Sequence, residues 1–453
     1  MDNNTRLSVM GGGLVGCLLS LYLAKQGYAV DVYERRPDLR HHDLDAGRSI
    51  NLALSDRGWR ALETIGIAEE IRKVAIPMYR RVIHDVQGNL SFQPYGQEGQ
   101  AIYSVSRGGL NHVLLDLAEA EPSISLHFQQ QVLEVEVNTN KVTLRNVATG
   151  QEHQVQPEVI FAADGAFSMV RLSLQKTDQF NYAQSYLNYG YKELTIPAAT
   201  DGSWQLEKNA LHIWPRGQYM MIALPNIDGS FTCTLFFPFQ GTPSFASLPT
   251  AVELERFFQE VFPDAISLMP NLAQEFFGHP TGSLVTINCL PWQRQGKILL
   301  VGDAAHAIVP FYGQGMNAGF EDCTVLRGLL EQHPGDWDTI FTSFQNLRKP
   351  NTDAIADLAV YNFIEMRDKV ADPRFLLQKK IEAKITGQFP DAWLPLYSMV
   401  TFSPDLPYAE ALGNGQRQEE IMRQLMAHIQ SEADYDKPEV QEYLQIHLGM
   451  GRP

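Results

Sequence analysis

A segment close to the N-terminus constrains the fold more than any other part of the sequence. A short apolar run at residues 7–10 leads directly into GGGLVG at residues 11–16. Apolar residues then recur at helical spacing until Gly27, and a second apolar run at 28–33 ends in Glu34. Strand, glycine-rich turn, helix, strand and acid in this order predict a dinucleotide-binding unit.

Each motif position in this unit has a predicted task. Gly11 permits the tight turn, Gly13 lets the backbone approach a pyrophosphate, and Gly16 lets the helix pack close to the strand. The unpaired N–H groups at the helix N-terminus would face the phosphates, and Glu34 would accept hydrogen bonds from a ribose. Three glycines in six residues often mark only a turn. The prediction therefore depends on the acid that lies 23 residues after Gly11.

The remaining pattern predicts the domain organisation. A chain of 453 residues is too long for one compact core, so two or three domains are expected. Residues 82–95 are rich in turn formers and are predicted to leave the first sheet, and strand-like runs separated by turns follow from about residue 181. The predicted fold class is α/β, with a Rossmann-like cofactor domain at 1–180 and 285–345 (82–100 contributing to the substrate site), an inserted antiparallel-sheet substrate domain at 181–284, and a C-terminal helical region at 346–453.

Composition excludes several classes of protein. There are 36 Lys and Arg residues against 52 Asp and Glu, and the formal charge of −16 disfavours a nucleic-acid or membrane-surface role. The cysteines are far apart without a CxxC pair, which argues against disulfides or zinc and suits a reducing cytoplasm. No signal peptide or membrane-spanning run is evident, so a soluble, cytoplasmic protein is expected. His41-His42-Asp43 is interpreted as an exposed loop, and no metal site is predicted.

A second motif lies at residues 297–322. Asp303 follows a buried strand-like run, and a glycine-rich loop around Gln314 leads into a helix that begins near Gly315. Asp303 would hold the hydroxyls of a sugar-alcohol chain, while the helix N-terminus would stabilise negative charge on an electron-accepting ring. The alternative is an ordinary loop. Glycines on both sides of Gln314 favour a ligand, because such a loop is costly to order without one.

Three motifs together resemble those of the single-component FAD-dependent aromatic hydroxylases. They are the glycine-rich segment with Glu34, the Ala163-Asp164-Gly165 turn with Ser168 and Arg171, and Gly302-Asp303 with the Gly313-Gln314-Gly315 loop. Members of that family use one dinucleotide fold for FAD and have no separate NADPH domain. This sequence also shows a single such fingerprint. The resemblance implies a flavoprotein monooxygenase that binds FAD and consumes NADPH and O2.

The resemblance also assigns residues to the cofactor, position by position. The implied FAD contacts are Gly11, Gly13, Val15, Gly16, Tyr33, Glu34, Arg35, Arg36, Ala53, Arg107, Val132, Asp164, Asp303, Gly315, Met316 and Asn317. A narrower match, covering nearly the whole chain, is to a branch of the family that acts on an aromatic amino acid. In that branch an arginine and a tyrosine hold the substrate carboxylate, and here they match Arg81 and Tyr95.

The other implied substrate contacts come from the sheet, the second motif and the C-terminal helices. They are Leu211, Ile222, Leu224, Thr234, Phe236, Pro310, Phe311, Tyr312, Asn362, Met366 and Tyr397. An isolated Asn or Tyr in helical sequence more often packs, and a lone Arg is more often solvated, so these assignments rest on the resemblance. Strand periodicity puts alternate residues on one face and leaves open which face points inward. Tyr312 departs from the histidine of some members, which would affect coupling or pH dependence if that position shuttles protons.

The implied mechanism places the chemistry on the flavin. NADPH would reduce FAD, oxygen would add to form a flavin hydroperoxide, and its distal oxygen would pass to the aromatic ring. No side chain is expected to act as a catalytic acid or base, and the C-terminal helices are candidates for excluding water. Two alternatives stay open: a sister hydroxylase of another aromatic acid, and a flavin-binding sensor or interaction protein without turnover. The chain is expected to be a monomer or a homodimer.

Overall fold

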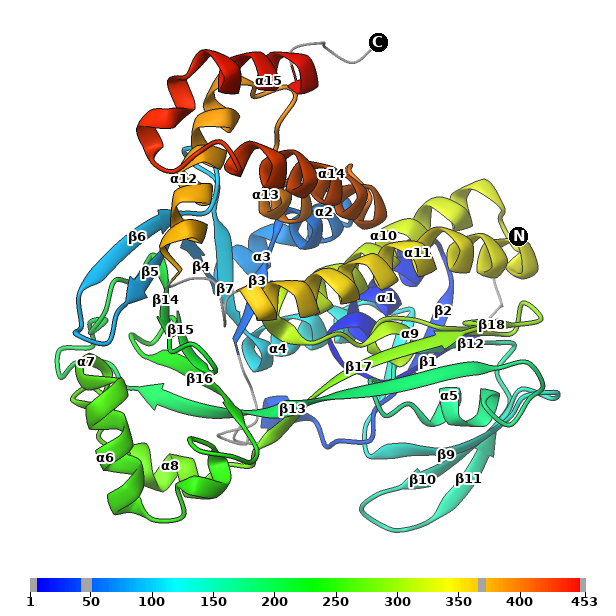
Figure 1. Ribbon diagram of the computed structural model, residues 1–453. Coiled ribbons are helices and arrows are strands. Elements are labelled where there is room, and N and C mark those ends of the chain that lie inside the picture. Colours follow the sequence, from blue (N-terminus) through cyan, green and yellow to red (C-terminus); the bar gives the residue numbers. More distant parts are fainter. Residues whose placement is uncertain (1–5, 42–50, 366–371, 449–453) are drawn as a thin grey trace.

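The structure is a computed structural model that describes residues 6–41, 51–365 and 372–448. Met366 and the His42-Asp43 pair, both singled out in the sequence, lie outside the described residues. Figure 1 shows two sheet-based regions side by side, with helices of the C-terminal part of the chain lying across both.

The first region is built on a six-stranded sheet in the order β18-β19-β12-β1-β2-β8. Its strands are parallel except for the antiparallel β18–β19 pair. Their bounds are β1 Arg6–Met10, β2 Ala29–Tyr33, β8 Ile124–His127, β12 Val159–Ala162, β18 Gln293–Arg294 and β19 Ile298–Leu300. The apolar runs at both ends of the predicted cofactor domain therefore meet in one sheet, as the sequence pattern predicts for a dinucleotide-binding unit.

Helices and two smaller sheets complete this region. α1 packs against both α4 and α10. The sheets have the orders β11-β10-β9 and β3-β7-β4. The bounds are α1 Leu14–Lys25, α2 Asp56–Thr64, α3 Ala68–Arg72, α4 Arg107–Glu119, α5 Met169–Leu174, α9 Asp303–His306, α10 Gly315–Gln332, β3 Asn51–Leu54, β4 Ala75–Met78, β7 Ile102–Ser106, β9 Gln130–Glu136, β10 Lys141–Asn146 and β11 Glu152–Val155.

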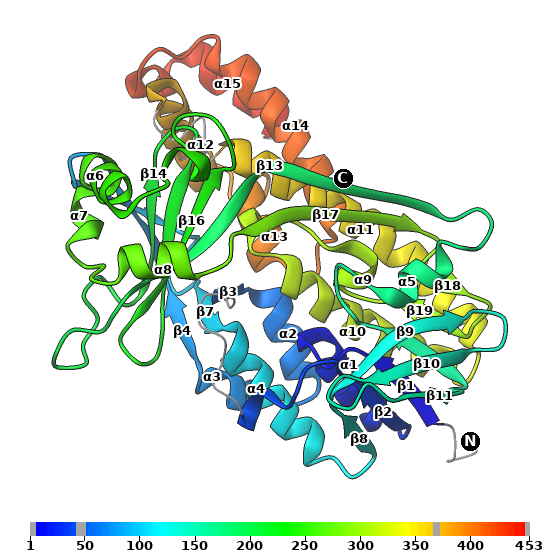
Figure 2. The same ribbon diagram turned by 90° about the horizontal axis from the view of Figure 1, so that it is seen from below.

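The second region is a seven-stranded sheet in the order β17-β13-β16-β15-β14-β5-β6. β13 has 16 residues, and Figure 2 shows it running beside β17 from this sheet toward the first region. Buried aromatic residues of the sheet pack on helices α6–α8. The bounds are β5 Arg80–His84, β6 Leu90–Pro94, β13 Asn181–Ile196, β14 Ala210–Pro215, β15 Met220–Pro225, β16 Phe231–Pro238, β17 Gly282–Leu290, α6 Ala251–Val261, α7 Pro263–Ile266 and α8 Leu272–Gly278.

The segment at 82–95 does leave the first sheet, but it is more regular than its turn-rich sequence suggests. Its two short strands, β5 and β6, extend the second sheet, with β5 parallel to β14. The strand partner lies about 130 residues further along the chain, so local sequence carries little information about this pairing.

Four helices follow α10 and α11 in the C-terminal part of the chain. The predicted boundary at residue 345 falls inside α11, which is continuous over 28 residues. The apolar stripe from Ile421 to Ile429 is buried against Ile381 and Ile385 of α12. Within the described ranges, no helix has the length and apolar character needed to span a membrane. The bounds are α11 Trp337–Ile364, α12 Pro373–Gln388, α13 Leu396–Phe402, α14 Tyr408–Met426 and α15 Pro438–Leu448.

Candidate active site

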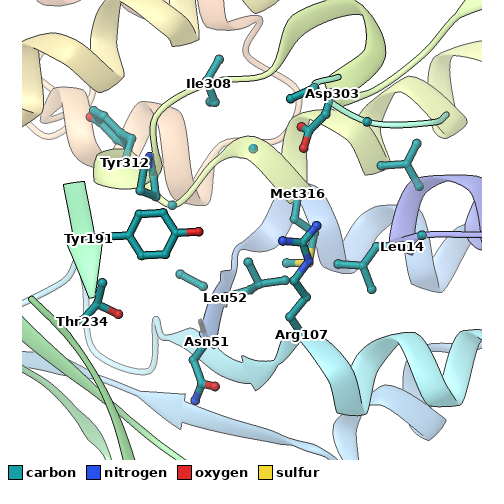
Figure 3. Close-up of a pocket in the computed structure, with 18 of the residues that line it drawn as sticks. Leu14, Asn51, Leu52, Arg107, Tyr191, Thr234, Asp303, Ile308, Tyr312 and Met316 are labelled. Atoms are coloured by element: carbon teal, nitrogen blue, oxygen red, sulfur yellow. The ribbon is translucent and has the colours of Figure 1, made fainter. Parts of the chain in front are cut away.

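A cavity of about 580 Å³ lies where the two sheet regions and the C-terminal helices meet. Gly13 and Asp303, separated by 290 positions in the sequence, both line it. Figure 3 shows side chains from both sheet regions pointing into this space, with Tyr191 of β13 directed toward Met316 at the start of α10. The two glycine-bearing motifs therefore converge on one site.

The dinucleotide motif is held together by close backbone packing. Gly11 has a φ of +106°, and a Cβ there would lie 2.4 Å from the carbonyl oxygen of Ala163. Gly16 faces the turn, and a Cβ on it would lie 1.9 Å from the carbonyl oxygen of Gly11. Gly13 begins α1 and has open space where a Cβ would stand. Gly11 and Gly16 are therefore required by the packing of the turn, whereas Gly13 leaves room for a ligand.

Glu34 lies at the end of β2 and is almost fully buried. One carboxylate oxygen accepts from the backbone N–H of Gly12 at 2.8 Å, and the other accepts from the Nε of Arg36 at 2.8 Å. Burial opposes ionisation, but Arg36 and these backbone donors outweigh it and lower the pKa of Glu34. The residue is thus an ionised acceptor at the cavity wall.

Two of the helices that start at the cavity, α1 and α10, have no side-chain cap at their N-termini. Their first N–H groups lack intrahelical partners, and each N-terminus carries partial positive charge. α1 has 12 residues and α10 has 18. The cavity is therefore suited to anionic groups at two places.

The Asp164 turn connects the first motif to the second. Ser168 caps α5 by accepting from the backbone N–H of Arg171, and the Arg171 guanidinium donates to the carbonyl oxygen of Ala304 at 2.8 Å. One oxygen of Asp164 accepts from the N–H of Met169, while its other oxygen is buried without a partner. Burial raises the pKa of Asp164. A buried polar oxygen of this kind can accept a hydrogen bond from a ligand in the cavity.

The second motif is anchored from behind by a buried carboxylate. Asp322 accepts from the backbone N–H of Gly302 at 2.9 Å and from Nε2 of His306 at 2.7 Å. His306 is buried and therefore structural in this arrangement. Asp303 itself remains at the cavity wall.

At the other end of the cavity, a cation lies beside two stacked aromatic rings, whose centres are 5.6 Å apart. The Arg81 guanidinium carbon is 4.8 Å from the ring centre of Tyr95 and 4.3 Å from that of Tyr397. No carboxylate of the described residues forms an ion pair with Arg81. Burial would lower the pKa of Arg81, but the hydroxyls of Tyr397 and Tyr95 outweigh it and raise that pKa. Arg81 and Tyr95 both line the cavity, and together they are suited to bind an anion.

The walls near Arg81 are largely apolar. Met220, Ile222 and Leu224 of β15 line the cavity, while Met221 and Ala223 belong to the core beneath α6–α8. The period of two thus directs the predicted face inward. Leu211, Thr234, Phe236, Pro310 and Phe311 complete this wall.

Two polar side chains from the C-terminal half flank this wall. Asn362 of α11 lines the cavity and donates to the carbonyl oxygen of Phe311 at 2.7 Å. Tyr312 stacks on Tyr397 with ring centres 5.5 Å apart. Burial raises the pKa of Tyr312 well above its ordinary value. Tyr312 is therefore a neutral phenol and does not replace histidine as a proton acceptor near neutral pH.

Nearly all the predicted contacts line the cavity, and two of those in the described ranges do not. Gly16 packs against the turn behind the cavity. Asn317 is fully buried and acts indirectly, donating to the carbonyl oxygens of Ala53 and Gly313. The predicted residues along the wall are Gly11, Gly13, Val15, Tyr33, Glu34, Arg35, Arg36, Ala53, Arg81, Tyr95, Arg107, Val132, Asp164, Leu211, Ile222, Leu224, Thr234, Phe236, Asp303, Pro310, Phe311, Tyr312, Gly315, Met316, Asn362 and Tyr397.

Several lining residues were not predicted from the sequence. Leu52 and Tyr191 belong to segments that match the family, and Figure 3 shows both side chains in the middle of the cavity, near Arg107. Met78 and Ile102 lie on short strands of the small β3-β7-β4 sheet. The alternation of side chains along β4 and β7 did not predict these two residues, because the neighbouring sequence does not show which face of each strand meets the second sheet.

The cavity fits an FAD molecule on the structural grounds given above. An uncapped helix with an open Gly13 suits the pyrophosphate, Glu34 and Val132 of β9 suit the adenosine end, and Asp303 suits the ribityl hydroxyls. The N-terminus of α10 beside Met316 suits the ring, and the orphaned oxygen of Asp164 offers a further polar contact.

Comparison with known proteins agrees with this geometry. A family model described as FAD binding domain matches residues 4–337. The chain is 51% identical to the kynurenine 3-monooxygenase of Flavobacterium johnsoniae over 97% of this chain and 98% of that one. It is 49% identical to that of Myxococcus xanthus, over 98% and 95% of the two chains. With that of Dictyostelium discoideum it shares 44% identity over 93% of each.

Solved structures show the same fold at low sequence identity. The tetrameric form of 2-methyl-3-hydroxypyridine-5-carboxylic acid oxygenase has a TM-score of 0.66 and 20% identity, over 83% of this chain and 95% of that one. PqsL of P. aeruginosa in complex with 2-aminobenzoylacetate has a TM-score of 0.65 and 18% identity, over 81% and 97%.

Fold, cavity and family model together define an FAD-dependent flavoprotein of the single-component hydroxylase class. The narrower resemblance seen in the sequence is also correct, because near-full-length relatives at 44–51% identity carry one name. The chain belongs to the kynurenine 3-monooxygenase family.

Proposed function

We propose that this protein is an NADPH-dependent FAD monooxygenase that hydroxylates L-kynurenine to 3-hydroxy-L-kynurenine. The observation that carries the proposal is Arg81, a cation beside two stacked tyrosine rings at a cavity wall with no carboxylate partner among the described residues. An amino-acid carboxylate would supply that partner. The apolar wall beyond it would take the aromatic ring of kynurenine.

In this proposal Arg81 binds the carboxylate, and the hydroxyl of Tyr95 donates to it. Tyr397 stacks against Tyr95, and its ring centre lies 4.3 Å from the Arg81 guanidinium carbon. Asn362 and Tyr397 are further polar contacts, while Ile222, Leu224, Phe236 and Phe311 exclude water from the ring. The implied contact at Met366 remains a prediction from the resemblance alone.

FAD, reduced by NADPH, supplies the oxygen-activating chemistry when it is bound. The chain orients kynurenine so that its reacting ring carbon faces the position of the cofactor ring near Met316. The aniline nitrogen of kynurenine donates electron density to the adjacent ring carbon, which makes that carbon the nucleophile. No side chain is required to abstract a proton from the substrate before the oxygen is transferred.

The test is a product assay with the purified, yellow holoenzyme. NADPH oxidation should accelerate when L-kynurenine is present, and 3-hydroxy-L-kynurenine should accumulate in step with it. NADPH oxidation measured with a panel of other aromatic acids distinguishes this enzyme from a sister hydroxylase, which would prefer one of those acids to kynurenine. Tight FAD binding without turnover on any substrate would instead indicate a sensor. The high identity to named kynurenine 3-monooxygenases favours neither alternative.

Arg81→Ala tests the carboxylate assignment directly. We expect the KM for kynurenine to rise at least a hundredfold, since a charge-assisted hydrogen-bonded pair contributes about 3 kcal/mol. FAD affinity should stay within twofold of the wild-type value, because Arg81 lies at the end of the cavity away from Gly13. Matched replacement of the exposed neighbour, Arg80→Ala, serves as the control. Unchanged kynurenine affinity in Arg81→Ala would contradict the assignment.

The expected physiological setting is tryptophan breakdown through kynurenine, with a possible link to pyridine nucleotide biosynthesis, in the cytoplasm. This expectation comes from the names of the relatives and from the sequence resemblance. Deletion of the gene tests this expectation and should cause kynurenine to accumulate in cells fed tryptophan.

A further inference from the structure

A chain of buried hydrogen bonds lies behind the strand that carries Arg81. Nδ1 of His84 on β5 is 2.6 Å from a carboxylate oxygen of Asp264, and Nε2 of His84 is 2.9 Å from Nδ1 of His212 on β14. Nε2 of His212 is 3.0 Å from the carbonyl oxygen of Glu207. Each histidine is 2% exposed. Neither lines the cavity, because side chains alternate along β5 and β14.

The partners at the two ends of this chain fix how many protons it holds. The carbonyl of Glu207 accepts only, and Asp264 already accepts from the indole N–H of Trp214 at 3.1 Å. The ring nitrogens that face them must therefore both carry hydrogen. A third hydrogen is needed between the two rings.

Burial lowers the pKa of His212 to about 4, so His212 is neutral at pH 7. Burial by itself would raise the pKa of Asp264, but hydrogen bonds from His84 and Trp214 outweigh it and lower that pKa. Asp264 is thus a carboxylate next to the His84 ring, and the pair forms a charge-assisted hydrogen bond.

Other charged groups near the rings have different partners. Arg216 donates to the backbone carbonyls of His84 and Asp85, at 2.9 and 3.1 Å, and it lies near Tyr219. The Asp85 carboxylate accepts from Asn89. The Glu207 carboxylate pairs with Arg80 at 2.8 Å. Among the described carboxylates, Asp264 alone hydrogen-bonds to either ring.

The hydrogen-bonded chain acts on β5, which has little other support. β5 pairs with β14 on one side, with Arg81 opposite Leu211 and Val82 opposite His212. Its other neighbour is β6, the last strand of the sheet, whose side chains are largely exposed. Asp264 belongs to α7, so the chain ties β5 to both β14 and a helix.

We propose that His84, hydrogen-bonded to Asp264 and to His212, is a positioning residue that fixes β5 and thereby aims Arg81 at the substrate carboxylate. This inference rests on the proposed function, because it takes Arg81 as the carboxylate partner. Loss of either bond frees β5 from α7 or from the side chain on β14, and kynurenine affinity then falls.

The main test is Asp264→Asn in the holoenzyme. The substitution keeps the shape of the side chain but removes the charge that strengthens the hydrogen bond to His84. We expect the KM for kynurenine to rise about tenfold, the effect of one charge-assisted hydrogen bond, while kcat and FAD affinity stay within twofold. Glu255→Gln, an exposed carboxylate on α6 of the same region, is the matched control and should leave KM unchanged.

A second readout follows the proton itself. In protein with 15N-labelled histidine, the short His84–Asp264 contact should give a downfield Nδ1–H resonance that Asp264→Asn removes. If Asp264→Asn removes this resonance while KM stays constant, the positioning role is overturned.

A pair of substitutions at His212 separates positioning from simple packing. His212→Gln keeps an acceptor for His84 and a donor for Glu207, so KM should remain near the wild-type value. His212→Leu keeps the volume but breaks both bonds, so KM should rise about tenfold. Equal KM values in the two variants would contradict the inference.

These results are distinguishable from failure of the proposed function. Normal kynurenine affinity in Arg81→Ala would remove the carboxylate assignment whatever the His84 variants do. Loss of affinity in Arg81→Ala together with unchanged KM in Asp264→Asn would keep the function and overturn only the positioning role.

Discussion

Gly11 and Gly13 show how two glycines of one motif perform different tasks. Gly11 has a φ of +106° and no room for a Cβ, which would approach the carbonyl oxygen of Ala163 to 2.4 Å. Gly13 has no positive φ, and no heavy atom of the protein lies within 4 Å of its would-be Cβ. The first glycine is required by the fold, and the second leaves space that only a ligand would fill.

Alanine at each position should separate these tasks. Gly13→Ala should leave the urea stability of the apoprotein unchanged and raise the Kd for FAD at least tenfold, because its methyl group occupies ligand space. Gly11→Ala should lower the apoprotein stability by about 2–3 kcal/mol, through backbone strain and the close contact. Urea unfolding and fluorescence titration with FAD measure the two effects. Equal loss of stability in both variants would contradict this division.

At the scale of elements, one carboxylate links three strands of the first sheet. Asp31 on β2 accepts from Arg6 of β1 at 2.8 Å and bonds Nε2 of His127 on β8 at 2.9 Å. Burial alone would raise its pKa, but the bonds to His127 and Arg6 lower the pKa of Asp31 to about 2. An ionised carboxylate therefore joins β1, β2 and β8, the last three strands at one end of the sheet.

This lowered pKa gives a pH dependence with a definite sign. Because the folded-state pKa lies below the ordinary value of 3.8, Asp31 contributes its full stability above about pH 4 and loses it as pH falls toward 2. Asp31→Asn should therefore be less stable than wild type at pH 5, and the difference should shrink by pH 3. Urea unfolding at several pH values measures this, with the exposed Asp178→Asn as control. A constant difference would show that Asp31 acts through packing alone.

At the scale of the whole molecule, a buried arginine joins the cofactor region to the C-terminal helices. Arg57 of α2 donates to Glu321 of α10 at 2.8 Å and to the carbonyl oxygen of Val400 in α13 at 2.8 Å. It also donates to the carbonyl oxygens of Ser403 and Leu406 just after α13. Because α13 carries Tyr397, this anchor sets the position of one wall of the cavity.

Arg57→Leu should loosen that wall and admit water. We expect a loss of about 3–5 kcal/mol in stability, since buried partners are left unpaired, and a several-fold rise in peroxide formed per NADPH oxidised with kynurenine present. Arg60→Leu, on the same helix with a partly exposed ion pair to Asp405, should change neither quantity much. The measurements are thermal unfolding and a peroxide assay run beside NADPH consumption. If the amount of peroxide formed per NADPH oxidised does not change, the position of α13 has no role in excluding water from the cavity.

Prediction from the sequence succeeded where a function needs a local pattern. The turn at Gly11, the acid at Glu34 and the helix beginning at Gly315 each follow from spacing within about 30 residues, and the structure has all three. Prediction failed to find Tyr191, Met78 and the His84–Asp264 bond. Tyr191 depends on pairing with strands 45 and 91 residues further along the chain, and Met78 on which face of a short strand meets a neighbour. The His84–Asp264 bond joins residues 180 positions apart.

The sequence by itself determined the cofactor class and the two ends of its site, because glycine turns, helix starts and terminal acids are encoded by adjacent residues. The resemblance then supplied the branch of the family. Only the tertiary structure decided that the even-numbered side chains of β15 face the cavity, that Arg81 lies beside two stacked tyrosines, and that a buried histidine bonded to Asp264 stands behind its strand. These facts depend on which distant surfaces pack together, and packing of distant surfaces is a property of the folded chain as a whole.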